Sequence, residues 1–282
     1  MKTVKDIKQM QETAEGFRQQ GKSIAFVPTM GFLHEGHLSL IRQARQTADI
    51  MVVSIFVNPA QFGPGEDYES YPRDPEKDSA LAQQQGTDVL FMPEKGDLYP
   101  EGYETYLYQQ SLPQHLCGLS RPGHFTGVMT IVAKLFNIIK PHYAVFGEKD
   151  YQQLAIIRKM TADLNFDTHI IGAPTVREPD GLAMSSRNKY LNKRQRNSAL
   201  AINRALSEAQ QMTAKGETRA RILIEAAVEK ITASPEVSVD YVKVCDPETL
   251  EDMEVVDRPA LMALAVKIGR TRLIDNAMLK PC

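Results

Sequence analysis

Two histidines and two glycines form the first stretch of the chain that could do chemistry. His34 and His37 stand three residues apart, Gly31 and Gly36 accompany them, and the apolar run of residues 23–30 comes directly before. Glycine lets a backbone turn sharply toward a ligand, and a helix beginning near Gly36 would point free N–H groups and its positive dipole end at a phosphate. Imidazoles at this spacing face the same way and could donate hydrogen bonds to phosphates as pyrophosphate leaves. The pattern predicts a grip on a nucleotide phosphate where a buried strand passes into a helix.

Two other interpretations of the histidine pair stay open on these residues alone. The pair could be solvent-exposed at the start of a helix, or it could be half of a metal site. The HExxH spacing of a zinc helix is absent, and no cluster of Cys or His completes a ligand set. The position of the pair directly after an apolar strand favours the phosphate grip.

A second candidate lies at the end of the next apolar run, where Asn58 and Gln61 follow residues 50–57. The carboxyl end of a parallel strand is where ligands bind, and two amides offer paired donors and acceptors to a hydroxylated or carboxylated small molecule. An ordinary turn whose amides cap loop backbone is the alternative.

A third candidate is the segment Gly147, Glu148, Lys149 and Asp150, which joins the apolar run of residues 143–146 to a helix. Lys149 could meet a phosphate or carboxylate as a compact positive charge, and Asp150 could cap the helix or accept from a ligand hydroxyl. A plain capped helix start with an exposed lysine explains the same residues.

A loop of small hydroxylated residues with one arginine, residues 181–188, is the fourth candidate. Its serines and Arg187 could close on a triphosphate and stabilise the leaving pyrophosphate. Neither Ser185 nor Ser186 lies in a G-x-S-x-G context, so we do not expect a serine nucleophile. A solvated hinge is the alternative. For Arg121 and His124, a binding loop and a structural turn both remain open.

The elements that must position these loops alternate between strand and helix from residue 3 to about residue 172. Short, nearly all-apolar runs are typical of parallel strands buried on both faces, and right-handed crossovers would wind them into a doubly wound sheet. We expect strands at 23–27, 50–57, 88–92 and 142–146, and helices at 3–20, 36–47, 75–85, 127–139 and 150–164. Thr3 is the expected N-cap of the first helix.

The texture of the sequence changes after about residue 175. Long polar helices are expected near 192–215 and 218–233, followed by strands at 237–244, 261–268 and 272–276. Together they suggest a small α+β unit with an antiparallel sheet. We therefore predict an α/β fold with a Rossmann-like domain over residues 1–175 and a smaller α+β domain over residues 176–282.

The composition favours a small-molecule partner. A chain of 282 residues with 43% hydrophobic content can bury a proper core, and its net charge of −2 gives no basic footprint for nucleic acid. No secretory signal is visible, and no apolar run approaches the roughly 20 residues that would cross a membrane. The three cysteines, Cys117, Cys245 and Cys282, are far apart and show no metal-like pairing, so a reducing cytoplasm is expected.

These motifs, taken together and in order, resemble one enzyme family. The early HxGH element and the late Ser/Arg loop resemble the class I aminoacyl-tRNA-synthetase-like nucleotidyltransferases, and within them the pantoate–β-alanine ligase family. The resemblance spans essentially the whole chain and rests on Pro28-Thr29-Met30-Gly31 with His34-Glu35-Gly36-His37, Phe56-Val57-Asn58-Pro59 with Gln61-Phe62, Arg121-Pro122-Gly123-His124-Phe125, Gly147-Glu148-Lys149-Asp150 with Gln152-Gln153, Ser185-Ser186-Arg187-Asn188, and Arg272-Leu273-Ile274-Asp275-Asn276.

The resemblance implies a two-step reaction on three small molecules. The carboxylate of (R)-pantoate would attack the α-phosphate of Mg-ATP to give an enzyme-bound pantoyl adenylate, and the amine of β-alanine would then displace AMP to form pantothenate. A carboxylate is already a competent nucleophile, so the first step needs alignment and charge stabilisation. Mg²⁺ would be held largely by ATP oxygens, and no tightly bound organic cofactor is expected. The family is typically dimeric, so a homodimer is implied, with the smaller domain covering the active site.

The resemblance also assigns roles residue by residue. His37 would be the proton donor, His34 would lie beside it on the phosphates, and Lys149 and Arg187 would stabilise charge. Gln61 and Gln153, with Asn58, would hold pantoate, and Gln61 would also meet β-alanine. The implied ATP contacts are Met30, Gly31, Phe32, Leu33, His34, Glu35, Gly36, His37, Gly147, Glu148, Lys149, Asp150, Val176, Met184, Ser185, Ser186 and Arg187.

Two other functions stay open at this stage. The chain could be another nucleotidyltransferase that moves AMP or CMP to a different acceptor, although the motifs around Gln61 and Gln153 argue against it. It could also be a catalytically silent nucleotide-binding regulator that retains the fold. The presence of both histidines, Lys149 and Arg187 favours an active enzyme.

Overall fold

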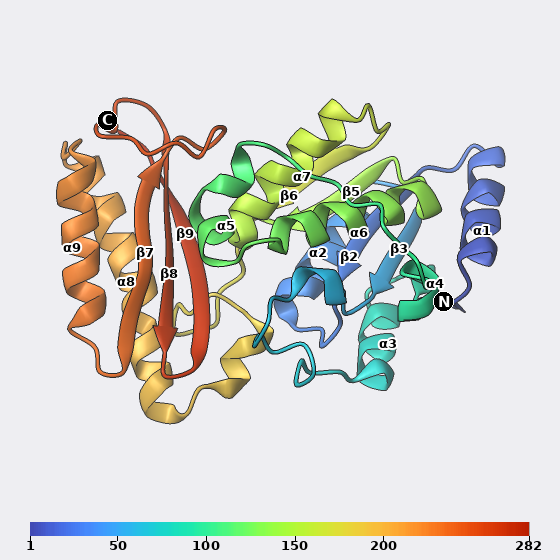
Figure 1. Cartoon of the computed structure of the whole chain (residues 1–282), viewed down its shortest axis with the longest axis horizontal. Helices are drawn as coiled ribbons and strands as arrows, with labels where there is room; N and C mark the ends of the chain where they lie inside the picture. The colour runs from blue at the N-terminus through green and yellow to red at the C-terminus, as the bar shows by residue number, and fades with distance from the viewer. Residues whose placement is uncertain (282) are drawn as a thin grey trace. The chain divides into compact units, whose positions relative to one another are not determined.

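The computed structural model describes residues 1–281 and divides into two compact units (Figure 1). Unit 1 contains Met1–Gln109, Arg121–Glu148 and Ile156–Pro174, and unit 2 contains Gln110–Ser120, Lys149–Ala155 and Thr175–Cys282. Cys282, one of the cysteines considered above, lies outside the described residues. Segments 110–120 and 149–155 therefore group with the C-terminal part of the chain, although the sequence places them among the first strands and helices.

Unit 1 is built on a six-stranded parallel sheet with strand order β1-β4-β3-β2-β5-β6. The strands are β1 (Lys2–Val4), β2 (Ile24–Thr29), β3 (Ile50–Ile55), β4 (Val89–Phe91), β5 (Tyr143–Gly147) and β6 (His169–Ala173). β2 pairs in parallel with both β3 and β5, so the strand order reverses beside β2. The prediction of a doubly wound parallel sheet is confirmed. The carboxyl ends of β2 and β5, at this reversal, are where such sheets bind ligands.

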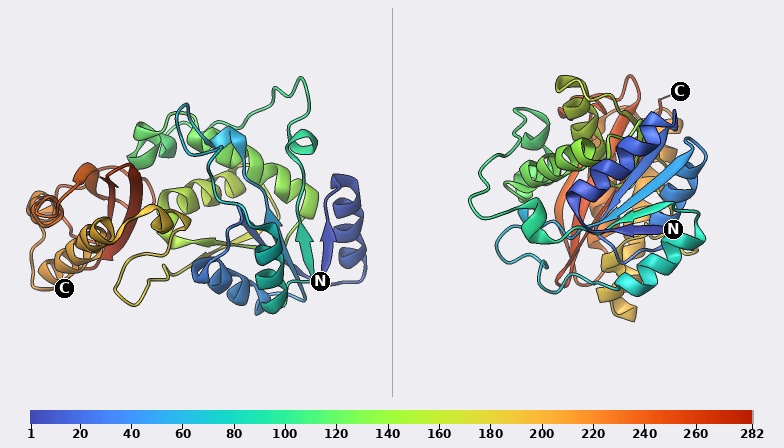
Figure 2. Two further views of the ribbon diagram at one scale, coloured as in Figure 1. Left: turned by 90° about the horizontal axis from the view of Figure 1, so that it is seen from below. Right: turned by 90° about the vertical axis from the view of Figure 1, so that its right-hand side faces the viewer.

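The four inner strands of unit 1, β2 to β5, are mostly apolar and buried because helices cover both faces of the sheet. Ala25 and Val27 of β2 pack with Ile41 of α2 (Glu35–Arg45), whereas Phe26, which points the other way, meets Phe136 of α6 (His124–Ile139) edge-on. Figure 2 shows α6 on the face opposite α2 and α3 (Pro75–Gln84). The remaining helices are α1 (Ile7–Gln19), α4 (Lys95–Leu98) and α7 (Tyr151–Asp163), of which α7 begins in unit 2 and ends in unit 1.

The first residues of the chain differ from the prediction. Residues 3–5 were expected to be helical, with Thr3 as the cap, but Lys2–Val4 form edge strand β1 and pair with β4. Helix α1 begins only at Ile7, where the Asp6 side chain accepts a hydrogen bond from the N–H of Gln9 at 2.7 Å. Strand pairing with a distant segment therefore overrides the local helical pattern. Strand β6 was not predicted either, because His169–Ala173 are mostly half-buried or exposed and form no continuous apolar run.

Unit 2 contains an antiparallel sheet of β7 (Val237–Cys245), β8 (Ala260–Ile268) and β9 (Thr271–Leu279), in that order. Two long helices, α8 (Lys193–Ala214) and α9 (Ala220–Thr232), pack beside it through Ile202, Leu206 and Leu223 (Figure 1). The expected α+β architecture is confirmed. β9 is longer than predicted because it pairs with β8 along its whole length, from Thr271 to Leu279. A short helix, α5 (Leu116–Ser120), completes unit 2.

No helix among residues 1–281 combines the length and the apolar character that a bilayer crossing requires.

Candidate active site

The loop from Met30 to His34 leaves β2 in a conformation that few residues tolerate. Gly31 has a φ of 80° and Phe32 a φ of 52°, both in the left-handed region. A Cβ atom on Gly31 would lie 2.9 Å from a carboxylate oxygen of Asp78 and 2.9 Å from a methyl carbon of Ile55. Both the backbone angle and the surrounding space therefore require glycine at position 31.

Asp78, on helix α3, holds this loop in place. Its two carboxylate oxygens accept hydrogen bonds from the backbone N–H groups of Phe32 and Leu33, each at 2.7 Å. The residue is only 2% exposed, and burial raises the pKa of Asp78 above its ordinary value even though the two N–H groups favour the charged form. No sequence motif singles out this residue, and its one local signal is its position on the same helix face as buried Ala82, four residues later.

Helix α2 begins at Glu35, so Gly36 and His37 lie in its first turn and His34 is its N-cap residue. The imidazole rings of His34 and His37 are adjacent, with centroids 4.1 Å apart. The backbone N–H of His34 donates to Nδ1 of His37 at 3.4 Å. A neutral His37 that accepts at Nδ1 carries its proton on Nε2, so Nε2 of this ring is a hydrogen-bond donor.

Asn58 and Gln61 lie at the carboxyl end of β3, beside the end of β2. Asn58 caps the short 3-10 helix Pro59–Gln61, and its amide nitrogen donates to Oε1 of Gln61 at 3.0 Å. Nε2 of Gln61 in turn lies 3.2 Å from the sulfur of Met30. The structure therefore brings Gln61 into contact with residues 30–34, which we call the glycine turn, as the parallel pairing of the two strands predicts.

Arg121 and His124 hold the main chain of Gln61. The carbonyl oxygen of Gln61 accepts from Nη2 of Arg121 at 3.2 Å and from Nδ1 of His124 at 2.8 Å. Arg121 also forms two hydrogen bonds with Glu66, at 2.6 and 2.5 Å. Burial would raise the pKa of Glu66, but the guanidinium of Arg121 outweighs it and holds that pKa below its usual range. These contacts make the Arg121-Pro122-Gly123-His124 segment a support for Gln61.

The remaining predicted site residues belong mostly to unit 2. Gly147 and Glu148 end the unit 1 segment, whereas Lys149 and Asp150 open the next segment of unit 2. The backbone carbonyl of Lys149 accepts a hydrogen bond from the side chain of Asn276 on β9 at 2.9 Å. Its ammonium lies 3.8 Å from the carboxylate of Asp150.

The two glutamines that follow differ in role. Gln152 is 6% exposed and bonds to the main chain of residues 112, 115 and 117, which fixes the short helix α5. Gln153 is half-buried and stays the candidate for substrate contact.

Val176 and Met184 lie side by side in unit 2. The N–H of Met184 donates to the carbonyl of Val176 at 3.0 Å, and an isolated bridge joins Arg177 to Ala183. Ser185 then caps the 3-10 helix Ser186–Tyr190, accepting from the N–H of Arg187 at 3.3 Å. The segment from Val176 to Ser185 thus forms a hairpin-like turn that leads into Ser186 and Arg187. We call residues 176–187 together the 176–187 turn.

Strand β9 anchors both unit 2 segments through adjacent residues. Asp275 accepts two hydrogen bonds from the guanidinium of Arg177, at 2.6 and 3.1 Å, while Asn276 holds the carbonyl of Lys149. Asp275 and Asn276 of the Arg272-Leu273-Ile274-Asp275-Asn276 motif therefore support two segments that carry predicted ATP contacts.

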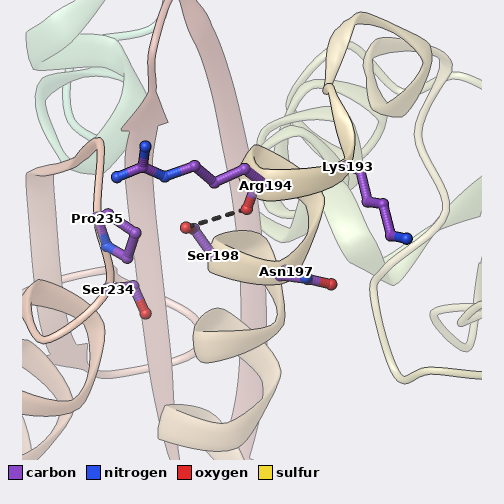
Figure 3. A pocket seen from close by; sticks show the side chains of 6 residues that line it. All are labelled: Lys193, Arg194, Asn197, Ser198, Ser234 and Pro235. Atoms are coloured by element: carbon purple, nitrogen blue, oxygen red, sulfur yellow. Dashed lines mark hydrogen bonds between the residues drawn. The ribbon is translucent and has the colours of Figure 1, made fainter.

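A cavity of about 540 Å³ lies elsewhere in unit 2, between the start of α8 and the turn after α9 (Figure 3). It is lined by Lys193, Arg194, Asn197, Ser198, Ser234 and Pro235. The Ser198 hydroxyl donates to the carbonyl of Arg194 at 3.3 Å, as the dashed line in Figure 3 marks. None of the predicted site residues lines this cavity.

The described residues offer hydrogen-bond donors for a phosphate more readily than ligands for a metal ion. Among residues 1–281, no group of three or more His, Cys, Asp or Glu side chains is placed to hold a metal ion. The start of α2 and its two imidazoles instead offer N–H donors near the carboxyl end of β2, whereas the N–H groups of Phe32 and Leu33 are already bonded to Asp78. These features define an α/β protein of the doubly wound class with a candidate anion site at its strand-order reversal.

Comparisons with known proteins identify the particular family. The family model of pantoate-beta-alanine ligase matches residues 2–278. The pantothenate synthetase of Desulfatibacillum aliphaticivorans is 57% identical over 281 residues, covering 100% of both chains, and that of Geobacter sulfurreducens is 52% identical, covering 99% of both. The chain belongs to the pantoate–β-alanine ligase family, as the motifs predicted.

Solved structures of this family agree in fold. The crystal structure of pantothenate synthetase from Thermus thermophilus superimposes with a TM-score of 0.94 at 43% identity, over 100% of both chains. The pantoate-beta-alanine ligase of Francisella tularensis, complexed with beta-gamma ATP and beta-alanine, has a TM-score of 0.82 at 35% identity. That comparison covers 99% of this chain and 97% of the other.

Proposed function

We propose that this enzyme condenses (R)-pantoate with β-alanine to give pantothenate, AMP and diphosphate through an enzyme-bound pantoyl adenylate. Membership of the family and the Francisella tularensis complex with beta-gamma ATP and beta-alanine support this reaction. The product is a precursor of coenzyme A. One observation carries the proposal further: Gln61, the proposed pantoate residue, lies 3.2 Å from Met30 of the proposed ATP loop.

In the first step, a carboxylate oxygen of pantoate attacks the α-phosphorus of ATP, and the bond to the bridging oxygen of pyrophosphate breaks. The attacking carboxylate needs no activation by a protein base, so alignment and charge stabilisation dominate catalysis. Contact between Met30 and Gln61 supports this step, because the residues proposed to bind the nucleotide and the nucleophile are neighbours. The Nε2 donor of His37, with His34 beside it, would follow the charge that develops on the phosphates.

Lys149 and Arg187 would supply the positive charge for this step. Both residues belong to segments of unit 2 that β9 anchors by hydrogen bonds. A fixed main chain limits the positions that each positive side chain can reach, which suits the stabilisation of a leaving group. The full proposed ATP set is Met30 to His37, Gly147 to Asp150, Val176 and Met184 to Arg187, with the smaller domain covering the site. Pantoate would be held by Gln61, Gln153 and Asn58.

In the second step, the neutral amine of β-alanine attacks the carbonyl carbon of the pantoyl adenylate. The C–N bond forms, the bond to the AMP oxygen breaks, and one amine proton is released. Gln61 would contact both pantoate and β-alanine, which keeps the amine near the acyl carbon.

Mg²⁺ enters this proposal as part of the Mg-ATP substrate. A magnesium ion that keeps phosphate oxygens and waters as ligands needs few protein carboxylates, which suits a chain whose described residues offer no dense acidic cluster. We further propose that the enzyme acts in the cytoplasm as a homodimer, in keeping with its family, and size-exclusion chromatography with light scattering would measure the oligomeric state.

Release of pyrophosphate from Mg-ATP tests the function directly. We expect release that requires pantoate, and AMP formation that depends on β-alanine. Release without pantoate would favour another nucleotidyltransferase, and no release with all three substrates would favour a silent nucleotide-binding protein.

A further inference from the structure

A chain of hydrogen bonds reaches Gln61 from a tyrosine that no sequence motif singles out. Tyr99 directly follows helix α4, and its hydroxyl donates to Oδ1 of Asn58 at 2.9 Å. Nδ2 of Asn58 then donates to Oε1 of Gln61 at 3.0 Å. All three residues belong to unit 1.

Two backbone groups fix the direction of this chain. Oδ1 of Asn58 also accepts from the N–H of Ala60 at 3.3 Å, and Nδ2 also donates to the carbonyl of Gly127 at 3.1 Å. A backbone N–H can only donate and a carbonyl can only accept, so the amide of Asn58 has one allowed orientation. Tyr99 must therefore donate, and Gln61 must accept through Oε1.

The consequence is a fixed orientation of the Gln61 amide. Because Oε1 already accepts from Asn58, the NH₂ group is the end that Gln61 can offer, and it points toward Met30. A pantoate molecule carries a carboxylate and two hydroxyl groups, all of which can accept a hydrogen bond. The orientation that the chain imposes therefore suits this substrate.

Tight packing keeps Tyr99 and Asn58 in register. Asn58 is 1% exposed, and the adjacent glycine of α6 is essential, since a Cβ on Gly127 would lie 2.2 Å from the carbonyl oxygen of Ala60. The ring of Tyr99 stacks on Phe56 with centroids 6.3 Å apart and meets Tyr103 edge-on at 5.1 Å. Burial raises the pKa of Tyr99, so its hydroxyl stays protonated and remains a donor.

We propose that Tyr99 is a positioning residue for pantoate, acting through Asn58 to hold the Gln61 amide with its NH₂ group toward a substrate oxygen. This inference rests on the proposed function. Of the two donors to Oδ1 of Asn58, Tyr99 is the closer, at 2.9 Å against 3.3 Å for Ala60. Without the hydroxyl, Oδ1 of Asn58 keeps only the longer bond from Ala60, so the amide that donates to Gln61 is held less firmly.

The first experiment compares Tyr99→Phe with Tyr103→Phe. Tyr99→Phe removes one buried hydrogen bond, so we expect the KM for pantoate to rise about five- to tenfold. We expect kcat and the KM for ATP to change less than about twofold. Tyr103→Phe removes a hydroxyl from the same aromatic group without touching Asn58, and it should leave all three values near those of the wild type. An unchanged KM for pantoate in Tyr99→Phe would overturn the proposal.

A double-mutant cycle with Gln61→Ala separates positioning from a general structural role. If Tyr99 acts through Gln61, adding Tyr99→Phe to Gln61→Ala should lower kcat/KM for pantoate by less than about twofold, because coupled residues are not additive. An equal loss in both backgrounds would overturn the proposal. The wild-type enzyme is the reference for the proposed function itself: if its turnover does not depend on pantoate, the function fails, whatever the variants do.

Discussion

The two units of this enzyme hold their candidate site residues by different means. In unit 1, side chains hold the main chain of the site loops by hydrogen bonds: buried Asp78 accepts from Phe32 and Leu33, and half-buried His124 donates to the carbonyl of Gln61. In unit 2, ion pairs hold the 176–187 turn. Arg177 pairs with Asp275, and Arg196 pairs with Glu178 and Asp180 at 2.6 Å each.

Buried hydrogen bonds make the site loop of unit 1 rigid, whereas a partly exposed ion pair in unit 2 responds to salt. Asp78 is buried and accepts two short hydrogen bonds from two consecutive N–H groups, so the glycine turn has its conformation before a nucleotide binds. The side chains of Arg196 and Asp180 are about one third exposed, at 33% and 34%, so salt screens their attraction. We therefore expect a preorganised phosphate grip in unit 1 and a more adjustable turn in unit 2.

The largest expected effect comes from the rigid grip itself. His37→Ala removes the Nε2 donor and should slow pantoyl-adenylate formation in single turnover by about 10²-fold or more. His37→Gln places an amide NH₂ near the position of Nε2, so it should recover part of the loss. An unchanged first step with a slow second step would contradict the role of His37 in stabilising the leaving phosphates.

The next effect tests the ion pair that anchors unit 2. The side chain of Asp275 is 2% exposed, and Asp275→Ala leaves the Arg177 guanidinium without its carboxylate. We expect the free energy of unfolding to fall by about 3 kcal/mol in urea titrations. Asp257→Ala is the control, because Asp257 is an exposed partner of Arg258, and its removal should cost less than about 0.5 kcal/mol. Equal losses in the two variants would remove the distinction between anchor and surface pair.

Asp78→Asn tests the anchor of unit 1. An amide can accept from only one of the two N–H groups of Phe32 and Leu33, and its own NH₂ faces the other. We expect a loss of about 2 kcal/mol in unfolding free energy together with weaker ATP binding in calorimetry. Asp74→Asn is the matched control on the same helix. Asp74 caps α3 through one bond to Lys77, a role that asparagine fills equally well. If Asp78→Asn bound ATP as tightly as the wild type, the loop would not depend on this carboxylate.

The smallest expected effect concerns pH and also belongs to unit 1. Nδ1 of His142 accepts from the N–H of Ile24 at the start of β2, and burial, aided by the charge of Arg18, lowers the pKa of His142 below its ordinary value of about 6.5. The folded state thus favours the neutral ring. Its contribution to stability is full above that ordinary value and is lost as the pH falls from there through the lowered folded pKa.

His142→Asn keeps an acceptor for Ile24 and cannot titrate in this range. Urea titrations between about pH 5 and 7.5 should show a smaller loss of stability on acidification in this variant than in the wild type. Identical pH profiles would mean that His142 does not titrate with folding.

The sequence predicted the strands and loops of the site better than their supports. Residues 24–29 and 50–55 form buried strands because their apolar runs are continuous, and the polar residues after them therefore fall at the carboxyl edge of the sheet. Asp78 and Tyr99 were missed because each acts on a residue more than forty positions away, at separations of 46 and 41. No local pattern encodes such pairings. β1 and β6 were not predicted for the same reason, because each is a strand only through its pairing with a distant strand, β4 and β5 respectively.

Isotopic labelling of the carboxylate oxygens of pantoate distinguishes an adenylate mechanism from attack elsewhere on ATP. Pantoate labelled with ¹⁸O at both carboxylate oxygens is converted with ATP and β-alanine, and the products are analysed by mass spectrometry. If the carboxylate attacks the α-phosphorus, AMP leaves with one ¹⁸O and pantothenate keeps the other in its amide carbonyl. AMP without label would contradict the adenylate mechanism, and label in inorganic phosphate alongside ADP would indicate attack at the γ-phosphorus instead.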